Sequence, residues 1–98
     1  MAKGYWVSVY RTIFDPEKLD AYNKLAAPAV AAGGGRVFVR GGKTVAHDDG
    51  IAERVVLIEF DSFDQAVAAH ASEAYQQALD VLSGGVERDF RIVEGVED

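Results

Sequence analysis

Hydrophobic side chains follow a two-residue period in four stretches of the chain, and this period is typical of β-strands. In Gly4–Thr12, aromatic and β-branched residues occupy both sides of the alternation. Arg54–Phe60 has the strongest strand character, and Val55, Leu57 and Glu59 share one of its faces. The four predicted strands are Gly4–Thr12, Val37–Val39, Arg54–Phe60 and Asp89–Glu94.

A three- and four-residue period predicts the first helix. Its apolar stripe consists of Leu19, Tyr22, Ala26, Ala29 and Val30. Asp15, followed by proline and glutamate, is typical of a helix start, because aspartate caps free amides and proline suits the first turn. Pro28 removes the bond to the carbonyl of Lys24, so we expect a kink there. Gly33–Gly35 should end the helix, with at least one glycine in the left-handed conformation.

A second helical region begins at Ser62, because Gln65 three residues later completes a capping-box signature. Ser72 can cap a further segment, so we expect a break near residue 71. Gly84 and Gly85 should end this region. Its apolar stripe consists of Phe63, Ala66, Val67 and His70, followed by Tyr75, Ala78, Leu79 and Leu82.

The connection between the two central strands is polar and rich in glycine. We expect a turn or bulge at Gly41 and Gly42, and Lys43–His47 could continue a hairpin. His47–Gly50 should form its tip, because Asp-Gly is a strong turn signal.

The predicted order is β-α-β-β-α-β within a single domain, residues 1–98. With right-handed crossovers, the compact solution is an α+β, ferredoxin-like fold: a four-stranded antiparallel sheet with the helices on one face. The strands are apolar on both faces, however, and helices cover only one. An exposed apolar sheet face marks an interface. We therefore predict a homodimer in which two sheets pack face to face as a dimeric α/β barrel.

Composition narrows the possible partners. The net charge of −6 disfavours nucleic acid and anionic membranes, since both need cationic patches. The chain contains no cysteine, so thiolate metal sites and cysteine nucleophiles are excluded. The N-terminus does not resemble a signal peptide, and no apolar run approaches bilayer-spanning length, so the expected location is the cytoplasm.

Two motifs suggest cofactors but lack the required context. Gly42-Lys43-Thr44 resembles the end of a phosphate loop, yet the upstream glycine would fall at Val37 and no helix is expected to follow. His47, Asp48 and Asp49 are metal-ligand types, but adjacent turn residues point in diverging directions. We predict neither a cofactor nor a metal site.

His70 and Glu59 are the candidate catalytic residues. His70 is the only histidine on an apolar helix stripe, where it could shuttle protons or simply pack while bonded to a backbone carbonyl. Glu59 interrupts an apolar strand, and a buried carboxylate must pair or take up a proton. Arg36, Arg40 or Arg54 could pair with Glu59 in a purely structural role.

A pocket between the sheet and the helices would be lined by amphipathic aromatic residues. Tyr22 and Tyr75 lie on the predicted helices, Trp6 on the first strand and Arg40 at a strand end, so these four are the candidate ligand-binding residues. Alternatively, these residues could have no ligand and simply pack in the core or at an interface. The expected ligand is small, with an aromatic or apolar body and an anionic group.

Several short motifs occur in a characteristic order along nearly the whole chain. They are Gly4-Tyr5-Trp6, Gly34-Gly35-Arg36, Arg40-Gly41-Gly42, Arg54 with Ile58-Glu59-Phe60, Ser72 with Tyr75-Gln76, and Ile92-Val93-Glu94-Gly95. Together they resemble domain-of-unknown-function family thirteen-thirty, within the dimeric α/β-barrel superfamily. The resemblance implies a ferredoxin-like protomer and a dimer, and it implies no established activity.

The sequence leaves three functions open. The protein could bind a small organic molecule and act as a cofactor-independent enzyme, it could bind such a molecule without turnover, or it could serve only as a structural dimerisation module. Other branches of the superfamily include cofactor-independent monooxygenases, lactone isomerases and haem-degrading enzymes, but a shared fold does not transfer chemistry.

Overall fold

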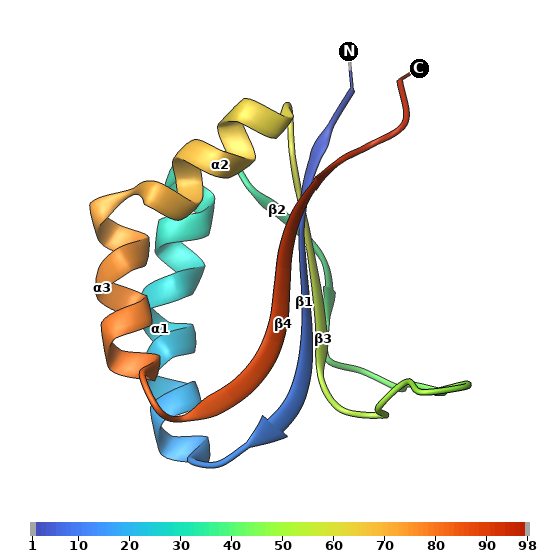
Figure 1. Ribbon diagram of the computed structural model, residues 1–98. Coiled ribbons are helices and arrows are strands. Elements are labelled where there is room, and N and C mark those ends of the chain that lie inside the picture. Colours follow the sequence, from blue (N-terminus) through green and yellow to red (C-terminus); the bar gives the residue numbers. More distant parts are fainter. Residues whose placement is uncertain (1, 98) are drawn as a thin grey trace.

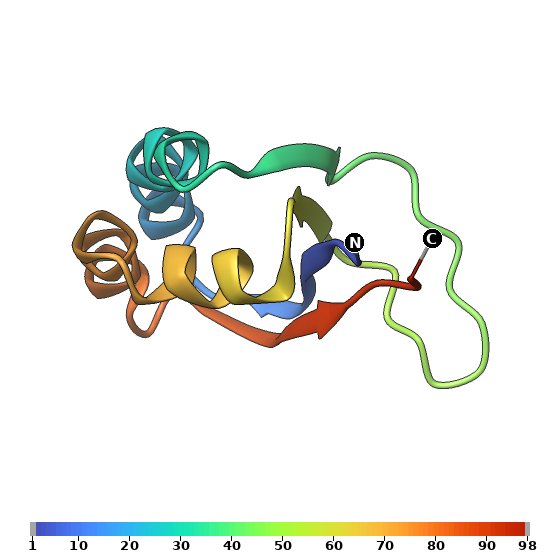
Figure 2. The same ribbon diagram turned by 90° about the horizontal axis from the view of Figure 1, so that it is seen from above.

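The computed structural model describes residues 2–97 and contains one layer of strands and one layer of helices (Figure 1). The helices lie together on one side of the sheet, as the view from above shows (Figure 2). In chain order the elements are β1 (Gly4–Ile13), α1 (Pro16–Ala32), β2 (Arg36–Arg40), β3 (Val55–Phe60), α2 (Phe63–Ala71), α3 (Glu73–Leu82) and β4 (Val86–Glu94).

The sheet is antiparallel throughout, with the strand order β2-β3-β1-β4. Its long central strand β1 pairs with β3 on one side and with β4 on the other. This order and the single helical layer confirm the predicted ferredoxin-like β-α-β-β-α-β fold. The predicted last strand was too short, because β4 begins at Val86, three residues before Asp89.

The helix ends follow the capping chemistry of the sequence. The Asp15 side chain accepts hydrogen bonds from two amides of the first turn, and α1 continues through Pro28 to Ala32. Gly34 has φ +87°, the left-handed conformation expected of a glycine after a helix. Ser72 separates α2 from α3 and caps the latter by accepting from the Tyr75 amide, which confirms the predicted break.

The capping box at the start of α2 forms only in part. Ser62 Oγ accepts a hydrogen bond from the Gln65 amide, as expected. The Gln65 side chain, however, donates to the backbone carbonyl of Gly33 at 3.0 Å. It therefore ties the end of α1 to the start of α2.

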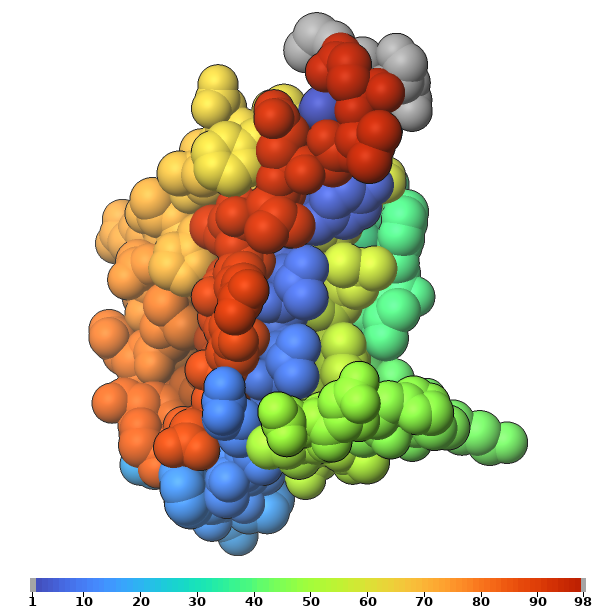
Figure 3. All heavy atoms as spheres, turned by 45° about the vertical axis from the view of Figure 1, so that its right-hand side comes forward, coloured from blue at the N-terminus to red at the C-terminus, as the bar shows by residue number. Residues whose placement is uncertain are grey.

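The prediction that Lys43–His47 continues a hairpin is wrong. These residues belong to an irregular segment between β2 and β3 that projects from the sheet (Figures 1 and 3). Gly41 and Gly42 both have positive φ, so the chain turns away from the sheet directly after β2. The expected tip does form, because the Gly50 amide donates to the His47 carbonyl at 2.9 Å.

Alternate residues of β1 face opposite layers. Trp6, Ser8 and Tyr10 point toward the helices and are almost fully buried, whereas Tyr5, Val7 and Val9 lie on the other face and are only partly buried. Figure 3 shows the four strands side by side on that second face, with no helix over them. We call it the outer face; the face toward the helices is the inner face.

Candidate functional site

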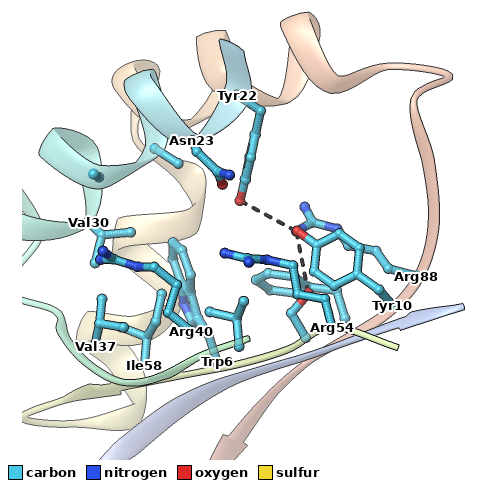
Figure 4. Close-up of a pocket in the computed structure, with 15 residues that line it drawn as sticks. Trp6, Tyr10, Tyr22, Asn23, Val30, Val37, Arg40, Arg54, Ile58 and Arg88 are labelled. Carbon is cyan, nitrogen blue, oxygen red and sulfur yellow. Dashed lines mark hydrogen bonds between the residues drawn. The ribbon is translucent and has the colours of Figure 1, made fainter. Parts of the chain in front are cut away.

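A cavity of about 110 Å³ lies between α1 and the inner face of the sheet (Figure 4). A single water needs only about 10–15 Å³ measured in this way, so the cavity can hold a small organic molecule. All four strands and α1 contribute to it. Its lining comprises Trp6, Ser8, Tyr10, Tyr22, Asn23, Ala26, Ala27, Val30, Val37, Arg40, Arg54, Val56, Ile58, Arg88 and Phe90.

Strand register brings polar groups together at one end of this pocket. Tyr10 of β1 pairs with Arg88 of β4, and Ser8 pairs with Phe90. Because cross-strand partners share a face, Arg88 is directed to the inner face beside the Tyr10 ring. Tyr22 reaches the same end from α1 (Figure 4).

Arg88 forms the centre of a hydroxyl cluster. Its Nη1 donates to Ser8 Oγ at 3.4 Å, to Tyr10 Oη at 3.2 Å and to Tyr22 Oη at 3.4 Å. Its Nη2 donates to Tyr75 Oη at 3.3 Å. The guanidinium also lies over three aromatic rings, those of Tyr10, Tyr22 and Phe90, at 4.9–5.6 Å from their centroids.

This guanidinium is charged although none of its partners is. Burial opposes the charge on Arg88, but the interactions with Tyr22, Tyr75 and Tyr10 outweigh it, and the pKa of Arg88 is raised. Within residues 2–97, no carboxylate forms an ion pair with Arg88. The cation is therefore held by neutral oxygens and aromatic faces alone.

Two tyrosines from different helices meet beside Arg88. The hydroxyl groups of Tyr22 and Tyr75 lie 2.7 Å apart. Tyr75 is completely buried, and burial raises the pKa of its phenol, so it remains protonated at neutral pH. Tyr75 does not itself line the pocket; it contacts the pocket through Tyr22.

Arg40 and Arg54 bring two further positive charges to the pocket (Figure 4). The Nε of Arg54 is buried and has no hydrogen-bond partner. Arg54 Nη1 would lie 3.1 Å from a Cβ at Gly41, so the glycine leaves space for the guanidinium. An unsatisfied buried donor is costly to the folded protein.

The structure brings the four predicted ligand-binding residues into one region. Trp6, Tyr22 and Arg40 line the pocket, and Tyr75 supports Tyr22 from behind. The Trp6 indole is fixed by donating to the Ala66 carbonyl at 2.8 Å. Two further arginines complete the lining: Arg54, which was expected only as a partner for Glu59, and Arg88, which the sequence pattern did not indicate.

His70 lies at the edge of the aromatic core, outside the pocket lining. Its ring is 5.2 Å from that of Tyr75, 5.3 Å from that of Phe90 and 5.9 Å from that of Trp6. Burial, followed by the nearby charge of Arg88, lowers the pKa of His70. The imidazole is therefore neutral at physiological pH.

Glu59 lies on the outer face and contacts neither the pocket nor His70. It accepts from Arg36 Nη2 at 2.9 Å and from Tyr5 Oη at 3.0 Å. The hydrogen bond from Arg36 is the main reason that the pKa of Glu59 is lowered. The sheet thus separates the two candidate catalytic residues, and Arg36 is the partner that Glu59 takes.

None of the described residues that line the pocket is acidic, and none is a histidine. Across residues 2–97, no group of three or more histidine, aspartate or glutamate side chains could hold a metal ion. No helix in the same range is long and apolar enough to cross a membrane. What the pocket offers chemically is a set of cations and hydroxyl groups against an apolar wall.

The sequence carries a family signature that spans nearly all of the chain. Residues 3–96 match the model of the domain of unknown function DUF1330, so the chain belongs to that family. Comparison with the curated proteins finds no match.

Solved structures share the fold at low sequence identity. The RPA0582 protein of unknown function from Rhodopseudomonas palustris has a TM-score of 0.76 at 15% identity, over 99% of this chain and 85% of that chain. A dimeric ferredoxin-like protein of unknown function from Thermobifida fusca has a TM-score of 0.60 at 14% identity, over 97% and 92%. A provisionally assigned antibiotic biosynthesis monooxygenase from Nitrosomonas europaea has a TM-score of 0.56 at 15% identity, over 97% and 90%.

Proposed function

We propose that this member of the DUF1330 family is a homodimer that binds a small organic anion in the pocket between α1 and the sheet. One observation carries the proposal: Arg40, Arg54 and Arg88 line the same pocket, and none of the described lining residues is acidic. Like charges repel one another in a confined space, so their convergence favours an anionic occupant.

The apolar residues of the lining indicate which kind of ligand body the pocket would accept. Trp6 and Phe90 offer aromatic surface, and Val30 and Ile58 complete an apolar wall. Pockets of this kind bind the apolar part of a ligand by burial and fix its orientation with a few polar groups. The expected ligand is a small acid with a ring or a short aliphatic body, its carboxylate toward Arg40 and Arg54.

The outer face supports the dimer. Val7 and Val9 of the central strand lie there beside Leu57 and Val55 of β3, and all four are only partly buried within the protomer. Val45 and Ile51 of the projecting segment are also exposed, at 81% and 45%. A second copy placed sheet to sheet would bury these apolar groups, and the Thermobifida fusca protein of the same fold is described as dimeric.

Titration calorimetry with benzoate and with neutral benzyl alcohol tests the binding proposal. Benzoate should bind at least about 10-fold more tightly, because a hydrogen bond to a charged group contributes about 1.5–3 kcal/mol. Arg40→Gln and Arg54→Gln should each weaken benzoate binding. Arg36→Gln, which removes an outer-face arginine, is the matched control and should leave benzoate affinity unchanged.

The proposal fails if benzoate and benzyl alcohol bind equally, or if Arg36→Gln weakens benzoate binding as much as Arg54→Gln does. Native mass spectrometry of the purified protein gives an independent check. A copurifying small acid in the wild-type protein, lost from the Arg54→Gln variant, supports the pocket as the place where it binds.

Catalysis by the same pocket is the second candidate, and the short contact between the Tyr22 and Tyr75 hydroxyls beside Arg88 favours it. Such a group can stabilise negative charge on a substrate oxygen. Turnover of the copurified acid would identify an enzyme, whereas reversible binding without product would identify a carrier or sensor.

A further inference from the structure

We infer that the Arg88 end of the pocket takes a single ionised hydroxyl oxygen, a phenolate or an enolate, with Tyr22 donating the decisive hydrogen bond. This inference rests on the proposed function and deepens it: the ligand class becomes small acids that carry an acidic phenol or enol. It depends on which groups accept the hydroxyl protons of the cluster formed by Ser8, Tyr10, Tyr22 and Tyr75 around Arg88.

Tyr75 sets the direction of the hydrogen bonds. Its oxygen receives Arg88 Nη2 at 3.3 Å, and its hydroxyl is 2.7 Å from that of Tyr22. A guanidinium has no acceptor, so Arg88 cannot receive the proton of Tyr75. Tyr75 is completely buried, and among the described residues only Tyr22 offers its proton an acceptor. Tyr75 therefore donates to Tyr22, since a buried unmade bond would be costly.

Tyr22 then has a proton that no residue of the described range 2–97 accepts. Its oxygen already receives hydrogen bonds from Tyr75 and from Arg88 Nη1. Because Tyr22 lines the cavity, its own O–H is available to a ligand there. A phenol that accepts two hydrogen bonds, one of them from a cation, is a strengthened donor, since bonds in such chains polarise one another.

Ser8 and Tyr10 repeat this arrangement at the same end of the pocket. Each oxygen receives a hydrogen bond from Arg88 Nη1, and each residue lines the cavity. Within residues 2–97, neither hydroxyl proton has an acceptor from the protein. This end of the pocket thus presents three available O–H donors, those of Tyr22, Ser8 and Tyr10, beside the charge of Arg88.

Several donors beside a fixed cation favour an ionised oxygen over a neutral hydroxyl group. The Asn23 amide or a hydroxyl oxygen could receive the proton of a neutral phenol, but the neutral oxygen gains much less from the donors and from the charge of Arg88. An oxygen anion accepts from several of them at once, as in an oxyanion hole. On binding, the O–H bond of the ligand breaks and its proton passes to the solvent, so the pKa of the bound hydroxyl falls.

The same geometry separates this oxygen from the carboxylate of the ligand. Both Nη atoms of Arg88 already donate to protein hydroxyls, which disfavours a carboxylate held there by two parallel bonds. Among the described residues, no ion pair or side-chain hydrogen bond holds the guanidinium of Arg54, so this group is available for that role. The pocket therefore has a carboxylate end at Arg40 and Arg54 and an oxyanion end at Tyr22.

The test uses 4-nitrophenol, whose phenolate absorbs visible light and whose phenol does not. In the wild-type protein, the pKa of the bound probe should fall by about one unit or more, as expected when charged and hydrogen-bonding groups favour the ionised form. Tyr22→Phe should abolish most of this shift, and Tyr75→Phe should reduce it. Tyr5→Phe removes a tyrosine hydroxyl from the outer face and should leave the shift unchanged.

Benzoate titration of every variant keeps this inference separate from the proposed function. If benzoate binds to the wild-type protein and to Tyr22→Phe, the pocket is intact in both. An unshifted or raised pKa of bound 4-nitrophenol, or a shift that Tyr22→Phe leaves intact, then overturns the oxyanion site alone. If neither benzoate nor 4-nitrophenol binds to the wild-type protein, the proposed function and this inference both fail.

Discussion

The two faces of the sheet use arginine in opposite ways. On the outer face, Arg36 pairs with Glu59 and Asp61, and Arg91 pairs with Asp89, all through contacts of 2.9–3.0 Å. On the inner face, Arg88 and Arg54 form no ion pair with any described residue. These two arginines of the outer face are thus paired with carboxylates, whereas Arg88 and Arg54 on the inner face have no carboxylate partner among the described residues.

This difference distinguishes arginines that are paired within the fold from arginines whose charge is open to a ligand. A paired surface guanidinium is satisfied by the protein itself and adds little to recognition. A partly buried guanidinium surrounded by neutral hydroxyls retains its field, and that field extends into the cavity. Glu59, the most conspicuous charge in the sequence, lies on the outer face and is paired. Arg88, in a less conspicuous stretch, lies on the inner face and has no carboxylate partner among the described residues.

The largest expected effect concerns the apolar centre of the outer face. Val7→Lys places a charge between β3 and β4 where a partner sheet would pack, and burying an unpaired charge costs several kcal/mol. We expect the wild-type protein to sediment as a dimer and the variant as a monomer at the same concentration. Ala68→Lys on the exposed side of α2 is the control and should stay dimeric. A wild-type monomer, or a dimeric Val7→Lys, would contradict the sheet-to-sheet arrangement.

An effect of intermediate size is expected when one arginine from each face is substituted and the free energy of unfolding is measured by urea denaturation without ligand. Arg54→Met removes the buried, unsatisfied Nε and keeps the apolar stem, so the free energy of unfolding should rise by about 1 kcal/mol. Arg36→Met leaves Glu59 without its cation and should lower the stability. If Arg54→Met destabilises the protein as Arg36→Met does, the contrast between the faces is wrong.

The smallest effect concerns pH and His70. Its pKa is lowered in the folded protein, so between the folded and unfolded values the unfolded chain binds more protons and stability rises with pH. The contribution is fully present above the unfolded pKa of about 6.5 and is lost as pH falls below it. Urea midpoints measured from neutral to mildly acidic pH should therefore fall more for the wild-type protein than for His70→Gln. Equal slopes would show that His70 does not titrate on unfolding.

Local signals in the sequence predicted the elements and the faces well. The caps at Asp15 and Ser72 and the left-handed glycine at the end of α1 follow from chemistry within a few residues. The two-residue period placed Glu59 on the face opposite Phe60, and the structure agrees. Lys43–His47 was misplaced because a hairpin depends on cross-strand pairing, and the positive φ angles at Gly41 and Gly42 direct the chain away from the sheet.

The pocket was predicted only in part, for a related reason. Trp6, Tyr22 and Arg40 could be proposed because each lies on a recognisable element with its polar tip toward one layer. Arg88 was missed because the predicted strand began after it, at Asp89, so it was assigned to no face. Had β4 been extended to Val86, the two-residue period would have placed Arg88 beside Phe90 on the inner face.

The order of the elements, the helix ends and the apolar character of both sheet faces follow from the sequence alone, because neighbours within about four residues decide caps and periodicity. Which charges meet depends on how distant parts of the chain pack together. Arg88 reaches Tyr22 across 66 positions and Tyr10 across 78, while Glu59 meets Arg36 on the far side of the same sheet. Such pairings depend on strand register and helix docking, which decide whether a charge is paired within the fold or left without a counter-charge in the pocket.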